Sequence, residues 1–389
     1  MKSNYKRIGD HIQLVDERNK GLRVKQLLGL SISKQFIPSV ANIVGTDMEN
    51  YKIIRKNQFA CSTMQVRRDK KMPVALLQEV DEAIISQAYP VFEVKDEKEL
   101  LPEYLMMWFE RSEFDREACF HAVGGVRGSL EWDDFENMQL PIPHPDKQRE
   151  IVKEYSTIQN RITLNQQLIQ KLEETAQAIY REWFVEFEFP DQNGKPYKSS
   201  GGKMVWNEEL GKEIPKGWKM KPISDVGEIK AGGDKPNVYS ENKTSKCPIP
   251  IYSNGITNDG LYGYTNKNNY PKNSITISAR GTIGFCVLRR EDFDAIVRLL
   301  VLIPFYSSSA IYLWQTIKKI EFANSGSVQN QLTIPQIGVV EILFPRIEIL
   351  NKYDSIASLI YQNIDLKNKE NQKLTELKEL FLSRLATVE

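Results

Sequence analysis

The chain of 389 residues is too long for one ordinary core and long enough for two domains with connecting elements. Its 52 Lys and Arg residues against 51 Asp and Glu residues leave a net charge of +1, so only local charge can argue for a nucleic-acid partner. Four cysteines without a CxxC pair and three histidines argue against a zinc site, and with the polar start MKSNYKRIGD they favour a cytoplasmic protein.

Residues 1–143 are predicted to form a first globular domain whose charge is polarised. RRDKK at 67–71 places four cations in five positions, and residues 1–25 hold seven cations against three anions. Residues 95–117 hold eight anions against four cations. This distribution favours a phosphate-facing side and a solvent side, although a run such as RRDKK is also often an ordinary solvated loop.

A long helix is predicted next, within a segment 144–189. Residues 147–185 contain no glycine or proline, and Pro141, Pro143 and Pro145 are expected to keep the helix from starting earlier. Steps of four and three keep one seam of side chains facing a partner helix. The seam consists of Ile151, Tyr155, Ile158, Ile162, Asn165, Ile169, Leu172, Ala176 and Ile179.

The stretch LEWDDFENMQLPIPHP at 130–145 returns as LTIPQIGVVEILFPRI at 332–347, with a constant offset of 202 residues. The paired positions are Gly124 and Gly326, Val126 and Val328, Leu130 and Leu332, Phe135 and Ile337, Leu140 and Ile342, and Pro143 and Pro345. Fainter echoes link 55–63 to 271–279 and 101–109 to 308–316 at other offsets. The chain is therefore predicted to be an internal repeat.

The same offset predicts a second helix, within 346–389. Its more polar seam is Tyr353, Ala357, Ile360, Ile364, Lys367, Asn371, Leu374, Lys378 and Phe381. Between the copies, residues 190–217 are rich in Gly, Ser, Lys and Pro and are predicted to be a linker. A second domain follows at 218–345, and its charge-free run at 299–317 is interpreted as a buried strand turning into a helix and not as a membrane span.

These elements predict an α+β protein with two related α/β-type domains, separated by two long antiparallel helices that form a coiled coil with approximate twofold symmetry. Asn165 and Lys367 fall at matching seam positions, where polar residues can fix register. The alternative is that each helix packs only on its own domain.

Two similar but non-identical heads on a stiff spacer suit duplex DNA. Thirty-nine helical residues span roughly 58 Å, whereas a DNA turn takes about 34 to 36 Å. In the second head, the glycine-bearing turns IKAGGDKP (229–236) and SARGTIG (278–284) allow close backbone approach to a phosphate, although each is also compatible with an ordinary surface turn. The candidate DNA contacts are Arg67, Arg68, Lys70, Lys71, Arg127, Lys230, Lys235 and Arg280.

Catalytic patterns are scarce in this sequence. There is no GxxxxGK[ST] loop and no Pro-Pro pair of the kind found in amino-methyltransferases. A nuclease-like set of Asp191, Glu228 and Lys230 spans a linker and a different domain, and we interpret it as coincidence. A coiled-coil adaptor that never touches DNA is the main alternative function, and a self-contained nuclease is the weakest.

The junctions IYREWFVEFEFPDQNGKPYKSSGGKMVWNEELGKEIPKGW at 179–218 and GSLEWDDFENMQLPIPHPDKQREIV at 128–152 resemble those of type I restriction-modification specificity subunits. The resemblance covers essentially the whole chain. It implies a non-catalytic DNA-reading scaffold with two target recognition domains, each reading half of a split site.

The resemblance also implies partners. Two modification subunits would methylate adenine with S-adenosylmethionine, and two restriction subunits would use ATP and Mg²⁺, so no cofactor is expected on this chain. Members of this family often carry GGT or GGS where this chain has Gly232, Gly233 and Asp234. Leucines off the second seam are expected to face a partner subunit: Leu359, Leu366, Leu377 and Leu380.

Overall fold

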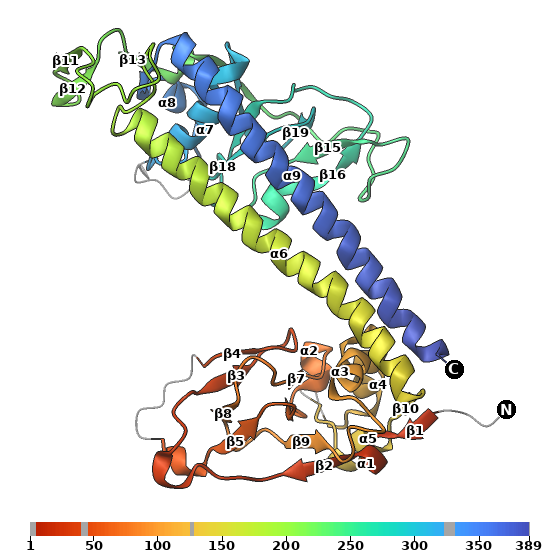
Figure 1. Cartoon of the computed structure of the whole chain (residues 1–389). Coiled ribbons are helices and arrows are strands. Elements are labelled where there is room, and N and C mark those ends of the chain that lie inside the picture. Colours follow the sequence, from red (N-terminus) through yellow and green to blue (C-terminus); the bar gives the residue numbers. More distant parts are fainter. Residues whose placement is uncertain (1–4, 40–45, 125–127, 323–330, 389) are drawn as a thin grey trace. The chain divides into compact units, whose positions relative to one another are not determined.

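The computed structural model describes residues 5–39, 46–124, 128–322 and 331–388 (Figure 1). Its contacts divide the chain into unit 1, Met1–Gln166 with Asn368–Glu389, and unit 2, Gln167–Lys367. The division cuts both long helices, α6 (Pro145–Phe184) and α9 (Ile347–Arg384), so each unit contains part of each. The predicted domain boundaries separate heads from helices instead and stay predictions. Four positions of the sequence argument lie outside the described residues: Val126, Arg127, Gly326 and Val328.

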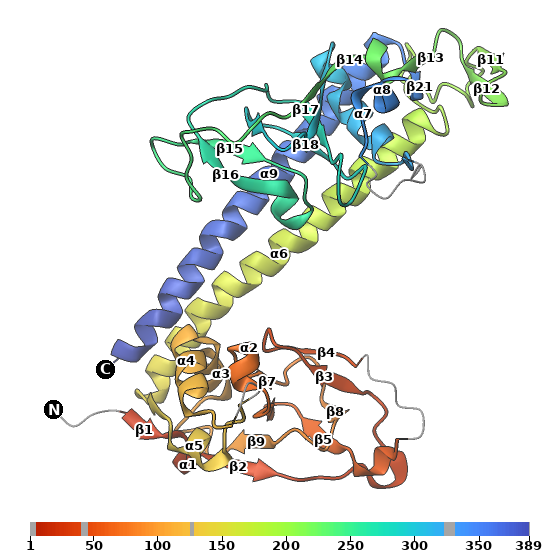
Figure 2. The ribbon, with the colours of Figure 1, turned by 180° about the vertical axis from the view of Figure 1, so that it is seen from behind.

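Unit 1 is built on an antiparallel sheet in the order β2-β9-β6-β7, with β5 paired to β8, β3 to β4 and β1 to β10. The strands are β1 (Tyr5–Arg7), β2 (Ile12–Val15), β3 (Leu28–Leu30), β4 (Phe36–Pro38), β5 (Lys52–Arg55), β6 (Phe59–Cys61), β7 (Val74–Leu76), β8 (Glu82–Ile85), β9 (Val91–Val94) and β10 (Gln139–Pro141). The helices before α6 are α1 (Ile8–His11), α2 (Val66–Asp69), α3 (Pro102–Glu110), α4 (Ser112–His121) and α5 (Trp132–Asn137). Helices α3 and α4 lie beside the first turns of α6 (Figure 2), where Leu101 N donates to Gln148 Oε1.

Unit 2 repeats this arrangement. Its main sheet runs β14-β20-β17-β18, β13 pairs with β21, and β15 pairs with both β16 and β19. The strands are β11 (Met204–Asn207), β12 (Lys212–Pro215), β13 (Lys219–Pro222), β14 (Gly227–Ala231), β15 (Ile249–Tyr252), β16 (Leu261–Thr265), β17 (Ser274–Ile277), β18 (Cys286–Arg289), β19 (Asp294–Ala295), β20 (Leu300–Pro304) and β21 (Glu341–Phe344). The shorter helices are α7 (Ala310–Ile317) and α8 (Ile334–Gly338).

The repeat predicted from the sequence is confirmed element by element. Helices α5 and α8, strands β10 and β21, and helices α6 and α9 all begin 202 residues apart. The fainter echo is also structural, since Asn57 and its counterpart Asn273 both have a left-handed backbone, with φ of 67° and 63°, just before β6 and β17. The charge-free run becomes strand β20 followed by helix α7, as predicted. Within the described residues, no helix is long and apolar enough to cross a membrane.

The start of α6 differs from the prediction. Pro145 is the first residue of the helix, so it does not delay the helix to Lys147 as expected. Proline suits this position because a first-turn N–H has no partner within the helix and the ring fixes a helical φ. The carbonyl of Pro143 instead accepts a hydrogen bond of 2.8 Å from Gln148 Nε2, which fastens the turn before the helix.

The stretch predicted as a linker contains a folded hairpin. Strands β11 and β12 pair in antiparallel register, and the preceding chain is anchored by aromatic rings. Phe189 stacks on Tyr197 at 4.5 Å and on Trp218 at 5.4 Å between centroids. These side chains belong to or pack on the main core of unit 2. Gly, Ser and Lys between the aromatic positions hid this packing from a search for periodicity.

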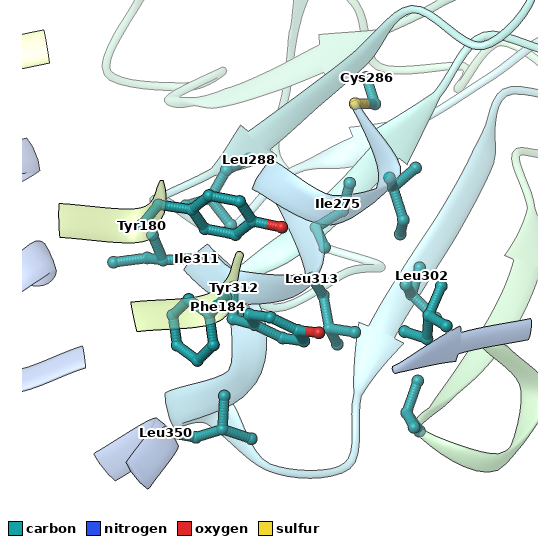
Figure 3. Packing of buried hydrophobic residues seen from close by; sticks show 14 of the residues in the cluster. Tyr180, Phe184, Ile275, Cys286, Leu288, Leu302, Ile311, Tyr312, Leu313 and Leu350 are labelled. Carbon is teal, nitrogen blue, oxygen red and sulfur yellow. The ribbon is translucent and has the colours of Figure 1, made fainter. Parts of the chain in front are cut away.

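Each unit has its own aromatic and aliphatic core. In unit 1, Phe59 stacks on Phe92 at 4.9 Å, and Phe109, Phe114 and Phe135 surround the pair, all essentially inaccessible to solvent. In unit 2, Figure 3 shows side chains of α6, α7 and the main sheet converging, among them Tyr180, Tyr312 and Leu302. Such burial, at about 25 cal/mol per Å² of apolar surface, is the main source of stability for both heads.

The long helices pair in antiparallel register within each unit (Figure 1). In unit 1, Tyr155 meets Phe381 and Asn165 donates to Asn371 Oδ1 at 2.9 Å, so ten residues forward on α6 correspond to ten back on α9. In unit 2, Trp183 packs on Tyr353 at 5.8 Å, another 18 residues forward and back. The predicted match of Asn165 with Lys367 is therefore wrong, because a constant offset finds repeated positions and not opposed ones.

The predicted seam lies on the covered side of both helices. Every one of its key residues is buried or partly buried: Ile151, Ile158, Ile162, Asn165, Leu172, Ile179, Tyr353, Ile360, Ile364, Leu374 and Phe381. The two alternatives from the sequence are both realised. Ile151 and Tyr155 belong to the core of the unit 1 head, and Tyr353 and Ile364 to that of unit 2, while the helices also contact one another.

The buried Asn165–Asn371 pair generates a stability prediction. Asn165 is only 3% exposed, so Asn371→Ala leaves a buried amide without its partner and should lower the free energy of unfolding by about 1–3 kcal/mol. Replacing both residues by Leu should restore most of the loss. Thermal unfolding measures this, with Asn363→Ala, an exposed position of α9, as the matched control. A double Leu variant weaker than Asn371→Ala would contradict the prediction.

Candidate nucleic-acid interface

The basic run RRDKK of unit 1 folds into the short helix α2 and the turn after it. Gln65 before the helix and Lys70 after it both have left-handed backbones, with φ of 64° and 52°. This compact turn exposes Arg67, Arg68, Lys70 and Lys71. The four predicted cations therefore share one surface, but they differ in what they contact.

Arg67 and Arg68 are engaged within the protein. The Arg67 guanidinium donates to the carbonyls of Ala122, at 2.8 Å, and Gly124, at 3.4 Å, and so braces the chain after α4. Gly128 packs against the same side chain, where an added Cβ would lie 2.7 Å from Arg67 Cβ. Arg68 forms an ion pair of 2.6 Å with its neighbour Asp69. These contacts give Arg67 a structural role that the sequence did not indicate.

Lys70 and Lys71 differ from the two arginines. Among the described residues, neither ammonium group makes a hydrogen bond or ion pair, and both side chains are exposed. They are the cations of this run that are available to a phosphate. The fifth candidate of the first head, Arg127, lies outside the described residues.

Lys230 of unit 2 lies on β14, two residues from Glu228 on the same face of the strand, and the two form an ion pair of 2.9 Å. Asp191, the third member of the nuclease-like set, accepts hydrogen bonds from Asn193 N and Lys195 N in its own turn. It lines a different depression from Glu228. Within the described residues, no group of three or more His, Cys, Asp or Glu side chains is placed to hold a metal ion.

Lys235 is packed against two aromatic rings. Its ammonium lies 3.6 Å from the centroid of Tyr239 and 5.3 Å from that of Tyr262, and the two rings are 5.6 Å apart. Cation–π attraction restrains the lysine. Lys235 nevertheless remains exposed, and the cluster presents a positive charge beside two rings at the surface.

The Gly232–Gly233 pair has a role other than the phosphate approach suggested by its sequence. Gly232 lies so close to the 295–299 segment that an added Cβ would come within 2.7 Å of Ala295 C. Gly232 N donates to Leu299 O, and Gly233 N to Ala295 O. The glycines are needed for close backbone contact inside unit 2, so this predicted flexible turn is a clamp.

Arg280 lies in the turn after β17, and its Nη2 donates to Gln331 Oε1 at 2.8 Å. The turn is fixed by Asn254, whose side-chain oxygen accepts from Ala279 N at 2.7 Å. The amide nitrogen of Asn254 donates to Val297 O, also at 2.7 Å. One side chain therefore ties the predicted turn of Arg280 to the segment 295–299, which the sequence did not single out.

Arg289 is a buried support beneath these turns. Its guanidinium lies 3.5 Å from the ring centroid of Tyr252 and donates to Thr276 Oγ1 and to the carbonyl of Asp259. Burial lowers the pKa of Arg289 to about 10, because desolvation disfavours the charged form. The group is still charged at neutral pH, and it holds the 257–260 turn to the sheet. Nothing in the local sequence distinguishes it from the exposed Arg290.

Sequence reasoning also missed the turn at Val297 and Arg298. Both residues have left-handed backbones, with φ of 54° and 59°. Such a conformation costs a residue other than glycine about 1–3 kcal/mol. No motif marks this turn, because its conformation is imposed by Gly232, Gly233 and Asn254, which are distant along the chain.

The chain matches the family model described as "Type I restriction modification DNA specificity domain" over residues 40–174 and 215–376, well over half its length. The chain belongs to this family. It is therefore a specificity subunit of a type I restriction-modification system, a DNA-recognition protein without catalytic activity of its own. The two matched segments fall on the two repeats, each covering part of a head and part of a long helix.

Specificity subunits of distant organisms are similar along most of their length. The HindI specificity subunit of Haemophilus influenzae is 22% identical, with 89% of each chain covered. The MjaIX specificity subunit of Methanocaldococcus jannaschii is 24% identical over 74% of this chain and 68% of its own. The crystal structure of the S subunit from M. genitalium has the same fold, with a TM-score of 0.66, 16% identity and coverage of 98% and 95%.

Proposed function

We propose that this specificity subunit reads a split, asymmetric site in double-stranded DNA, one half with each head. The observation that carries the proposal is the repeat itself. The same sheet order recurs in both units, while the exposed turns that project from it differ in length and sequence. A shared frame with different turns suits two related docking modes that read different bases.

The helices would set the spacing between the two readings. α6 has 40 residues, which at 1.5 Å per residue is about 60 Å of continuous helix. Because α6 and α9 pair in one antiparallel register, neither can slide without breaking contacts such as Asn165–Asn371 and Trp183–Tyr353. A fixed helix pair supports an unspecified DNA spacer of fixed length.

The helices would also dock two modification subunits, which methylate adenine at N6. Large apolar side chains are exposed on both helix parts of each unit, where water is an unfavourable neighbour. In unit 1 these are Leu164, Leu377 and Leu380, and in unit 2 Leu168, Ile356, Leu359 and Leu366. The four leucines that the sequence assigned to a partner are among them.

The chemistry would belong to the partner subunits. S-adenosylmethionine would be bound by the modification subunits, and ATP and Mg²⁺ by two restriction subunits joined through them. Flipping of the target adenine out of the duplex would be carried out by the modification subunit. The heads of this chain would only position the base.

Exchange of residues 1–143 for those of a relative tests the proposal. The hybrid, expressed with its modification subunits, should methylate a sequence in which one half is new and the other half and the spacer are unchanged. The reciprocal exchange of residues 218–345 is the matched control and should change the other half. Sequencing of methylated adenines gives the result, and an unchanged methylated sequence after both exchanges would refute the proposal.

The cations of the first head provide a second prediction. In the assembled complex, Lys70→Ala and Lys71→Ala should each weaken duplex binding and lower the slope of log K against log salt by about 1, because each removes a phosphate contact. Lys98→Ala, an exposed lysine in the acidic stretch 95–117, is the control and should leave the slope unchanged.

Arg67→Ala should behave differently, since its guanidinium holds two carbonyls, and it should lower the melting temperature as well. The adaptor alternative makes the opposite prediction for all these variants. An adaptor that never touches DNA would show no duplex binding at low salt and no effect of replacing Arg67, Arg68, Lys70 and Lys71 by Ala.

A further inference from the structure

The turn from Ile296 to Leu299 in unit 2 has a backbone that its two central side chains disfavour. Val297 and Arg298 have φ of 54° and 59°, and Leu299 N donates to Ile296 O at 3.1 Å. Positive φ at both central positions with this hydrogen bond describes a type I′ turn, which Asn and Gly adopt readily. A β-branched valine there is a genuine outlier, because its Cβ crowds the backbone.

The surrounding chain holds this turn in place. Val297 N donates to Gly233 O at 2.9 Å, and Arg298 N to Gly232 O at 3.2 Å. On the other side, Asn254 Nδ2 donates to Val297 O at 2.7 Å. Strained backbone persists only where its surroundings determine it in this way.

The side chains gain nothing inside the protein that offsets the strain. Val297 is 49% exposed, and Arg298 is exposed as well. Among the described residues, the Arg298 guanidinium makes no hydrogen bond or ion pair. Asn and Gly would relieve the strain at no cost in buried contacts, so the two side chains are explained by a contact outside this chain.

We propose that Val297 and Arg298 form a base-reading turn of the second head. Arg298 donates with both arms of its guanidinium to the N7 and O6 edge of a guanine in the major groove, and Val297 packs against the methyl group of a neighbouring thymine. This assignment rests on the proposed function, that the heads read DNA. The planar fork of arginine matches guanine, and small apolar groups match the thymine methyl.

The position of the turn supports this role. Asn254 connects it to Ala279, beside Arg280, so both arginines project from one hydrogen-bonded group of turns. A turn fixed before binding loses little conformational freedom on contact with DNA. Rigid presentation of two side chains is what discrimination between base pairs requires.

The test is the double variant Val297→Asn with Arg298→Gly, in the full chain expressed with its modification subunits. Its melting temperature should rise, because the new residues suit the turn. Methylated-adenine sequencing should show the second half of the site relaxed at one or two adjacent positions, by about tenfold or more, with the first half unchanged. Lys267→Ala, an exposed lysine of the same unit, is the matched control and should change neither.

Arg298→Lys separates base reading from simple charge. It keeps the cation but lacks the fork, so discrimination should fall while the salt dependence of binding stays the same. A double variant that methylates the same sequence with the same efficiency would overturn the assignment. Uniform weakening over all sequences, with the salt slope lowered by about 1, would also overturn it, since that marks a phosphate contact.

The outcome is distinguishable from failure of the proposed function. If exchange of residues 1–143 leaves the methylated sequence unchanged, the heads do not read DNA. If that exchange alters one half and the double variant at Val297 and Arg298 keeps the other, only the role of this turn is refuted.

Discussion

The antiparallel packing of α6 against α9 is the constraint on which both heads depend. In each unit, part of one helix and part of the other complete the core of the head: Ile151, Tyr155 and Leu382 in unit 1, and Phe184, Tyr353 and Ile364 in unit 2. The helices are therefore not a spacer added to finished domains. A head that lost either helix would expose the apolar surface that these residues now cover.

Above this constraint, the molecule separates a shared frame from individual turns. The main sheets have the same order of strands, and even the left-handed Asn before the third strand of each sheet is repeated at Asn57 and Asn273. The turns differ because they are held by local contacts that tolerate change. In unit 1, Arg67 braces the chain after α4, whereas in unit 2 Gly232, Gly233 and Asn254 hold a strained turn. Such a division lets the bases read by one head vary without disturbing the joint to the helices.

The sequence predicted those features that depend on periodicity. The seam of α6 and α9, the offset of 202 residues and the strand-to-helix run at 299–317 were all visible, because helices and buried strands repeat their apolar positions. Features that depend on contacts between distant residues were not. The partner of Asn165 requires the antiparallel register, and the hairpin of β11 and β12 depends on the stacking of Phe189 between Tyr197 and Trp218. Charge alone also could not separate the engaged Arg67 from the exposed Lys70.

The account is tested most directly by lengthening both helices at opposed positions. Because Asn165 meets Asn371, a seven-residue insertion after Gln166 lies opposite one after Lys369, and seven residues keep the seam on the same face. The insertion adds about 10 Å of helix, equivalent to about three base pairs at 3.4 Å each. The methylated site should keep both half-sequences and gain up to about three unspecified base pairs between them. A methylated site with the original spacing would contradict the claim that the helices set the distance between the two readings.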